Sequence, residues 1–377
     1  AKTGILCDAQ VIRVVRRKVE EHRLERLVVD PILRAGGGYT FMGDETLEVF
    51  KAEMIPVAEL LTPNLFEASI LAGTGEIADV EGMQEAAGRL RRLGAKNVLI
   101  KGGHLPEEPI DLFYDGRKFT TYEAKKRTVS AHGTGCTLSA AITAGLAQGL
   151  SLQEGILAAK KHLDGLLDHP LTLGQGQHLL DHLFPLRREA ERYALFQSSL
   201  QTLEQLKKEK IGCLIPEVQS NLGVALPEAR GPEDVLAVPG RIIGQGEDIH
   251  WIAPPAFGAS RHVAKIVLTV LRHDPARRAA MNLRYSPAVL EACRYLGFMI
   301  GRFNRGEEPE EITSREGASL EWGTERAIET LGEVPDVVYD EGGIGKEPMV
   351  RILGDDAQDI CHKVLAIHRQ LVKSRGG

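Results

Sequence analysis

The sequence predicts an α/β protein built from two domains. The chain has 377 residues, 43% of them hydrophobic, and domains of about 150 residues are common, so it is long enough to bury two cores. In its first part, short apolar runs alternate with helical stretches, the pattern of a parallel sheet covered by helices. A charged stretch with leucines at helical spacing follows at residues 187–210. We therefore expect one domain at residues 1–185, a helical linker at 186–207 and a second domain at 208–377.

The composition indicates a cytoplasmic enzyme. The 46 basic and 52 acidic residues leave a formal net charge of −6, and no basic face with interleaved aromatic residues predicts nucleic-acid binding. Charges interrupt every apolar run before the roughly 20 residues that a membrane span needs, and no signal peptide opens the chain. The five cysteines lack Cys-x-x-Cys spacing, so neither a zinc site nor a disulfide framework is indicated. We expect small-molecule substrates, no nucleic-acid or membrane partner, and leave homo-oligomerisation open.

The elements of the first domain follow in order. A helix is expected at residues 79–93, and two strands at 110–114 and 118–122 flank Asp115-Gly116, a strong hairpin signal. A long apolar helix begins at Gly135, and a second helix occupies about residues 153–167.

Polar side chains follow three apolar strands of this domain. They are Asp30, Asn64, Glu67 and Lys101. Because open α/β sheets bind ligands at the carboxyl ends of their strands, we expect these side chains to meet there. Carboxylate and amide oxygens suit magnesium, so Asp30, Asn64 and Glu67 are the candidate metal ligands. Lys101 is the candidate phosphate ligand.

Each of these four residues also has a purely structural interpretation. Asp30 precedes a proline and fits a turn, while Asn64 and Glu67 have the spacing of a helix capping box. Lys101 also fits as a solvated surface charge. For one residue alone the structural interpretation is favoured, but the occurrence of all four at strand or helix ends favours a site.

The segment Gly133-Thr134-Gly135-Cys136 predicts a phosphate-binding helix start. Backbone N–H groups at a helix N-terminus attract anions, and glycine lets a phosphate approach the main chain closely. The helix dipole would favour the thiolate of Cys136, which makes it a candidate base. The alternative is a common glycine turn with a small packing cysteine.

Together these motifs resemble the hydroxymethylpyrimidine and phosphomethylpyrimidine kinases of thiamine biosynthesis, members of the ribokinase-like superfamily. The resemblance covers about residues 1–185 and implies a ribokinase-like sheet. It also implies that Gly133, Thr134 and Gly135 hold the transferred phosphoryl group of ATP and that Cys136 is the base. Lys101 would then neutralise phosphate charge beside Mg²⁺.

This resemblance also implies an incomplete kinase domain. In the family, about a third of the domain precedes the segment that opens this chain and holds the pyrimidine. We therefore expect the first sheet to lack strands, and this chain by itself not to phosphorylate hydroxymethylpyrimidine.

The second domain carries its own cluster of cations. A predicted strand at 234–238 leads to Gly240-Arg241, and Gly258-Ala259-Ser260 leads into a helix that begins with Arg261 and His262. With Ser260 as its cap, this helix start predicts a second anion site. The alternative is a capped helix with two solvated basic residues.

Further polar residues follow at strand ends. They are Asn282, Arg284, Asp340, Lys346, Glu347 and Arg351. In order, these segments resemble the thiamine-phosphate synthase domain that is fused behind pyrimidine kinases. This resemblance spans about residues 208–375. It implies an α/β sandwich that couples hydroxymethylpyrimidine diphosphate to thiazole phosphate, with Arg241 and His262 as catalytic residues.

The chemistry of this reaction agrees with these residue types. Loss of diphosphate builds negative charge on the leaving group, which arginine and helix N–H groups stabilise. Gly258, Ser260 and Arg261 would hold the diphosphate, with Asn282 and Arg284 as further phosphate-binding candidates. From charge alone, Asp340 or Glu347 would bind magnesium, and Lys346 and Arg351 the thiazole phosphate.

Two other functions stay open at this point. The same domain occurs as a thiamine-phosphate sensor on DNA-binding modules, in forms that tend to lack the catalytic arginine and histidine. Arg241 and His262 are present here, which favours the enzyme. The other alternative is that the first domain is an inactive remnant that supports the second.

Overall fold

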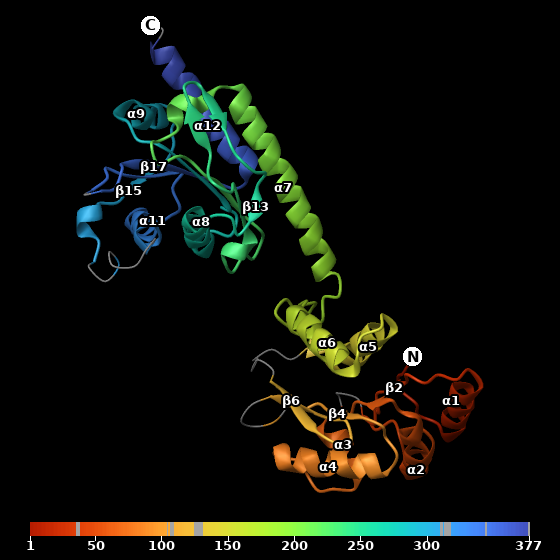
Figure 1. Ribbon diagram of the computed structural model, residues 1–377. Coiled ribbons are helices and arrows are strands. Elements are labelled where there is room, and N and C mark those ends of the chain that lie inside the picture. Colours follow the sequence, from red (N-terminus) through yellow and green to blue (C-terminus); the bar gives the residue numbers. More distant parts are fainter. Residues whose placement is uncertain are drawn as a thin grey trace. The chain divides into compact units, whose positions relative to one another are not determined.

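The computed structural model describes residues 1–34, 38–103, 105, 109–123, 131–309, 312, 318–343 and 345–375. The chain forms two compact units, Ala1–Phe184 and Pro185–Gly377. Both combine a central sheet with helices (Figure 1), which confirms the predicted α/β class.

Unit 1 has a six-stranded sheet with the order β1-β2-β3-β4-β5-β6. Its strands are β1 (Lys2–Thr3), β2 (Val28–Val29), β3 (Leu60–Leu61), β4 (Val98–Ile100), β5 (Ile110–Tyr114) and β6 (Phe119–Glu123). The first four pair in parallel, whereas β4, β5 and β6 pair antiparallel. The predicted hairpin around Asp115-Gly116 is therefore confirmed. A separate pair joins β7 (Ala131–His132) to β8 (His178–Leu179).

Helices cover both faces of this sheet. They are α1 (Ala9–Glu21), α2 (Asp44–Glu53), α3 (Leu65–Ala72), α4 (Val80–Arg92), α5 (Thr134–Ala147) and α6 (Leu152–Leu167), with a 3₁₀ turn η1 (Ile55–Val57). Val29 and Leu61 pack with α1 to α4, whereas their neighbours Val28 and Leu60 pack with α5 and α6. This alternation is the two-residue period of a strand buried on both faces. The helices predicted at 79–93, from Gly135 and at 153–167 are confirmed as α4, α5 and α6.

Unit 2 has a seven-stranded sheet with the order β13-β10-β9-β14-β17-β16-β15. Its strands are β9 (Leu222–Ala225), β10 (Val235–Ala237), β13 (Ala256–Phe257), β14 (Ala279–Arg284), β15 (Ile300–Arg302), β16 (Val337–Asp340) and β17 (Met349–Gly354). Only β15 and β16 pair in parallel among these described strands. A two-stranded ribbon joins β11 (Ile243–Gln245) to β12 (Asp248–His250).

The helices of unit 2 also lie on two faces. They are α7 (Phe184–Lys208), α8 (Arg261–His273), α9 (Pro287–Tyr295), α11 (Ala318–Leu331) and α12 (Ala357–Arg375), with 3₁₀ turns η2 (Ile211–Leu214), η3 (Pro232–Asp234) and η4 (Arg305–Glu307). Met281 and Ile352 pack toward α7, α9 and α12, while their neighbours Ala280 and Leu353 pack toward α8 and α11. Unit 2 is therefore a three-layer sandwich (Figure 1).

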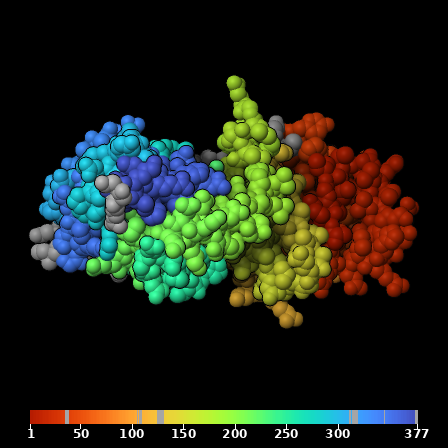
Figure 2. Space-filling view, turned by 90° about the horizontal axis from the view of Figure 1, so that it is seen from above, coloured from red at the N-terminus to blue at the C-terminus, as the bar shows by residue number. Residues whose placement is uncertain are grey.

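Helix α7 contains the predicted linker but does more than connect. Leu195, Leu203 and Leu206 on this helix belong to the core of unit 2, and Thr202 donates a hydrogen bond to the carbonyl of Ala357 at the start of α12 (3.1 Å). Figure 2 shows α12 (dark blue) beside the green α7. The stretch predicted as a linker thus supplies a wall of the second core.

None of the helices in the described part of the chain is long and apolar enough to cross a membrane.

Candidate functional site

In unit 1, Asp30 and Lys101 form a buried ion pair at the carboxyl ends of β2 and β4. Lys101 Nζ lies 3.1 Å from Asp30 Oδ1, and their side chains are 16% and 1% exposed. Thr62 and Ser139 donate further hydrogen bonds to the Asp30 carboxylate (3.2 and 3.1 Å). Lys101 is thus no solvated charge. The predicted metal role of Asp30 is not favoured, because both its oxygens already accept hydrogen bonds from protein donors.

Asn64 and Glu67 form the capping box of α3. The Asn64 side chain accepts from the Glu67 N–H, and the Glu67 carboxylate accepts from the Asn64 N–H, both at 2.8 Å. Burial raises the pKa of Glu67, against the opposing charge of Lys101. The structural interpretation of this pair is confirmed. No group of three or more His, Cys, Asp and Glu residues that could hold a metal ion occurs among the described residues.

The helix start at residues 133–136 has the geometry of an anion cradle. Gly133, with a φ of +89°, precedes α5, and no side chain caps the helix. A Cβ atom on Gly135 would lie only 3.0 Å from Lys101 Nζ, so the ammonium group sits directly at the helix start. Cys136 is exposed rather than packed in a core. The fold therefore brings Lys101 and the 133–136 segment together, as the sequence predicted.

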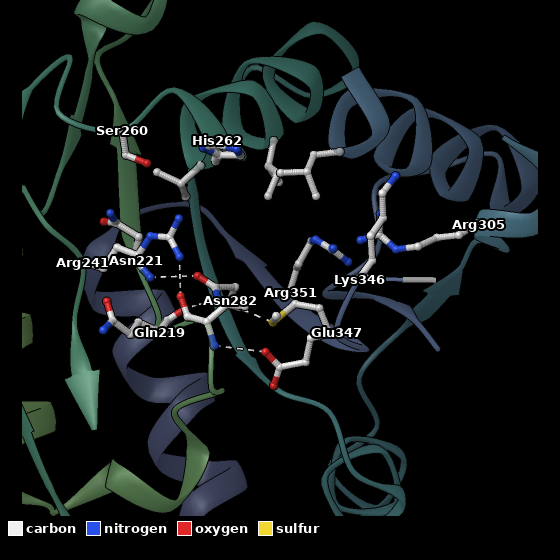
Figure 3. Close-up of a pocket in the computed structure, with 16 residues that line it drawn as sticks. Gln219, Asn221, Arg241, Ser260, His262, Asn282, Arg305, Lys346, Glu347 and Arg351 are labelled. Atoms are coloured by element: carbon white, nitrogen blue, oxygen red, sulfur yellow. Dashed lines mark hydrogen bonds between the residues drawn. The ribbon is translucent and has the colours of Figure 1, made fainter. Parts of the chain in front are cut away.

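In unit 2, most of the predicted site residues line one pocket of ≈ 270 Å³ (Figure 3). The predicted residues that line it are Arg241, Ser260, His262, Asn282, Lys346, Glu347 and Arg351. Polar residues that sequence reasoning missed also line it: Gln219, Asn221 and Arg305. Four cationic side chains, one histidine and a single carboxylate thus surround the space, which is the charge balance of an anion-binding pocket.

Four predicted residues do not line this pocket: Gly258, Arg261, Arg284 and Asp340. Arg261 and Arg284 are exposed. Arg284 shares a face of β14 with the pocket residue Asn282, but it is the last residue of that strand and lies outside the pocket. Gly258 makes the left-handed turn before α8 (φ +74°). Ser260 occupies the N-cap position, but its side chain makes no capping hydrogen bond, so the predicted cap is wrong and its hydroxyl is left at the pocket.

Backbone strain marks two loops at the pocket, one that carries Arg241 and one that carries Gln219. Arg241 and Gln219 have φ angles of +73° and +69°, a conformation that costs most residues other than glycine about 1 kcal/mol or more. Arg241 Nη1 donates a short hydrogen bond to the Val218 carbonyl. Glu347 accepts from the backbone N–H groups of Glu217 and Val218, both at 3.1 Å. These hydrogen bonds hold both loops at the pocket despite the cost of their backbone strain.

A pair of asparagines forms the floor between β9 and β14. The Asn221 backbone N–H donates to the Asn282 side chain (2.8 Å), and the Asn282 amide donates to the Gln219 carbonyl (2.9 Å). Asn221 also exchanges two hydrogen bonds of 2.9 Å with the backbone of Val238. Asn282 therefore holds the pocket wall together, a role that the sequence did not indicate.

Asp340 is fully buried between two arginines. Its carboxylate accepts from Arg305 Nε (2.5 Å) and Nη2 (3.2 Å), and Arg351 Nη1 lies 2.8 Å away. The predicted magnesium role of Asp340 is not favoured, because two guanidinium groups already pair with its oxygens. Burial lowers the pKa of Arg351, opposed by the charge of Asp340.

Comparison with known proteins gives two family matches. Residues 1–181 match the family described as phosphomethylpyrimidine kinase, and residues 200–366 match thiamine-phosphate synthase ThiN. The bifunctional thiamine biosynthesis protein ThiDN of Methanocaldococcus jannaschii is 29% identical over 98% of this chain and 81% of that protein.

Two further relatives each match one half. Thiamine-phosphate synthase ThiN of Methanothermobacter thermautotrophicus is 36% identical over 45% of this chain and 88% of its own length. The hydroxymethylpyrimidine/phosphomethylpyrimidine kinase of Haemophilus influenzae is 36% identical over 48% of this chain and 69% of its own length.

Proposed function

We propose residue roles for a chain that belongs to the phosphomethylpyrimidine kinase family in its first half and to the thiamine-phosphate synthase ThiN family in its second. Its function lies in thiamine biosynthesis, and both halves are transferases.

In the synthase pocket, Arg241, His262 and the first turn of α8 bind the diphosphate of hydroxymethylpyrimidine diphosphate. The bond between the methylene carbon and the diphosphate oxygen breaks, and the thiazole nitrogen forms the new bond to that carbon. Negative charge grows on the departing diphosphate, where a guanidinium and free helix N–H groups stabilise it. His262 donates a proton or hydrogen bond to the leaving oxygen. The opposite wall, with Lys346 and Arg351, is left for the phosphate of the thiazole substrate.

In unit 1, the N–H groups at Gly133, Thr134 and Gly135 bind a phosphoryl group of ATP. Lys101 neutralises its charge, and Asp30 holds Lys101 in place through their buried ion pair. Cys136, exposed in the first turn of α5, is the base. These roles are positioning and electrostatics, which is what phosphoryl transfer requires of a protein.

The described residues do not fit a dedicated magnesium cage. Both carboxylate oxygens of Asp30 and of Asp340 already pair with protein donors, and Glu67 is engaged in its capping box. We propose that Mg²⁺ reaches either site bound to substrate phosphates, as this ion often does.

We also propose a cytoplasmic location, because both reactions use phosphorylated metabolites.

The convergence of Arg241, Ser260 and His262 on one pocket with three further cations carries this proposal. Its test is His262→Asn in the full chain, assayed for thiamine phosphate formation from the two phosphorylated substrates. We expect turnover to fall by about 10²-fold or more, since general acid catalysis contributes about 10²–10⁴-fold. His250→Asn is the matched control, because His250 is exposed on β12 and does not line the pocket. Near-normal turnover of His262→Asn would refute the role.

A further inference from the structure

The anion-binding side chains of the synthase pocket fall into two groups on opposite sides. Figure 3 shows Arg241, Ser260 and His262 on one side, and Arg305 and Lys346 on the other. The first group belongs to the helix start of α8 and to the loop that carries Arg241. The second group belongs to η4 and to the segment between β16 and β17. The proposed function requires two anionic substrates, and the pocket offers two separate cationic walls.

We propose that Arg305, Arg351 and Lys346 form a phosphate-monoester subsite that selects phosphorylated thiazole over the free alcohol, and that Asp340 is the positioning residue that holds both arginines. This inference rests on the proposed synthase function. It adds Arg305, which the sequence did not indicate, and assigns Asp340 a role in place of metal binding.

The charge balance of the buried cluster supports an anion ligand. Two guanidinium groups share one carboxylate, so the Arg305–Asp340–Arg351 cluster carries one uncompensated positive charge. The side chains of Arg351 and Asp340 are 2% and 0% exposed, and a buried unpaired charge is costly unless a partner reaches it. Both arginines line the pocket, so a phosphate there supplies that partner.

The arginines also keep donors free for a ligand. A guanidinium has five N–H donors, whereas Asp340 accepts from only two atoms of Arg305, Nε and Nη2. Among the described residues, Asp340 is the only ion-pair partner of Arg351. The remaining donors suit the oxygens of a phosphate, which arginine binds through paired hydrogen bonds.

Phe303 makes this wall rigid. Its ring centroid lies 5.5 Å from the Arg305 guanidinium carbon and 5.3 Å from that of Arg351. Gly323 permits this placement, because a Cβ atom there would lie only 2.4 Å from the ring. Lys346 is tethered to Glu308 (3.2 Å) and Ser319 (2.9 Å). The cations are thus held in place before any ligand binds, which lowers the entropy cost of binding.

The test compares Arg305→Gln with Arg302→Gln in the full chain. Arg302 pairs with Glu341 on the surface (2.9 Å), where its side chain is 56% exposed, so it matches Arg305 in chemistry but not in location. KM is measured for each substrate with the other saturating, and also for the unphosphorylated thiazole alcohol.

We expect Arg305→Gln to raise the KM for thiazole phosphate by about 10-fold or more, since the substitution removes a charged hydrogen bond to the phosphate. The KM for hydroxymethylpyrimidine diphosphate and kcat should change less than about twofold, and the preference for thiazole phosphate over the alcohol should fall by the same factor as its kcat/KM. Arg302→Gln should behave like the unaltered chain. An unchanged KM and an unchanged preference in Arg305→Gln would overturn the inference.

Asp340→Asn tests the positioning role, with the same selective rise in the KM for thiazole phosphate expected. If circular dichroism shows that this variant does not fold, Lys346→Met decides the subsite instead, since its side chain is 37% exposed. A KM increase equal for both substrates would overturn the assignment. Failure of the unaltered chain to form thiamine phosphate would instead overturn the proposed function, and with it this inference.

Discussion

Arg241→Gly should separate catalysis from stability at the synthase site. Arg241 is exposed and has a φ of +73°, a backbone conformation that glycine adopts without strain. Removing its side chain takes away the group proposed to bind the diphosphate. The backbone, by contrast, keeps the same conformation but is no longer strained in it.

The expected stability change is small because its contributions oppose each other. Relief of the left-handed strain contributes about 1–2 kcal/mol. Loss of the hydrogen bond from Arg241 to the Val218 carbonyl costs about 0.5–1.5 kcal/mol, and the greater freedom of glycine in the unfolded chain costs roughly 0.5–1 kcal/mol. The free energy of unfolding should therefore change by less than about 1 kcal/mol, while turnover falls by about 10²–10³-fold, the usual loss for one transition-state donor.

Both quantities can be measured on the same preparation. The chain has two tryptophans, Trp251 and Trp322, and both lie in unit 2. Their fluorescence during urea unfolding therefore reports the stability of the synthase unit alone. Thiamine phosphate formation gives kcat and KM.

Lys210→Gly is the matched control. Lys210 also has a positive φ, +57°, and is exposed away from the pocket, so it should show a similar small stability change with unaltered turnover. Near-normal turnover of Arg241→Gly would refute the catalytic role. A loss of more than about 2 kcal/mol in Arg241→Gly would refute the strain argument.

Three further outcomes are expected. Lys160→Met should lower the stability of unit 1, measured by circular dichroism, by about 3 kcal/mol, because it removes the charged partner of the buried Asp111 at 2.5 Å. Adding Asp111→Asn should restore part of the loss, and an additive result would contradict the pairing. The pKa of Asp336 is lowered because, against the effect of burial, hydrogen bonds and neighbouring cations favour its carboxylate. Its stabilising effect is thus present above its unfolded pKa and lost as pH falls through the lower folded value. Asp336→Asn should therefore destabilise unit 2 at pH 7, and this difference should disappear as the pH falls below that lower folded pKa, which tryptophan fluorescence follows. Lys101→Met should weaken ATP binding in calorimetry by about 10-fold or more, whereas Cys136→Ala should leave that affinity unchanged; equal affinities for Lys101→Met and the unaltered chain would argue against the cradle.

The local elements and several site residues could be predicted from sequence because their signals are local. The hairpin at Asp115-Gly116 follows from turn chemistry, and the helix starts at Gly135 and near Ser260 follow from composition and periodicity. Arg241 and His262 were predicted from motifs at strand and helix ends, and they do line one pocket. The α/β class likewise follows from the alternation of strands and helices.

Residues that belong to no sequence motif could be assigned to the pocket only from the tertiary structure. Asn221 and Arg305 occur in no recognisable pattern, and each becomes part of the pocket only because β9, β14 and η4 are brought together. Asp340 shows the converse case. Its charge alone predicted a metal ligand, but the fold buries it between Arg305 and Arg351, and these guanidinium groups already pair with its oxygens.

By itself, then, the sequence determined the alternating strands and helices of both units, the glycine-rich helix start at residues 133–136 and the arginine and histidine motifs of the synthase half, since each of these depends on neighbours within a few residues. Only the fold places Lys101 beside that helix start. Only the tertiary structure decided that α7 is part of a core, that Ser260 does not cap its helix and that Asp340 binds arginines. The physical reason is that burial, charge pairing and hydrogen-bond saturation depend on groups far apart in the chain, and local patterns carry no information about those partners.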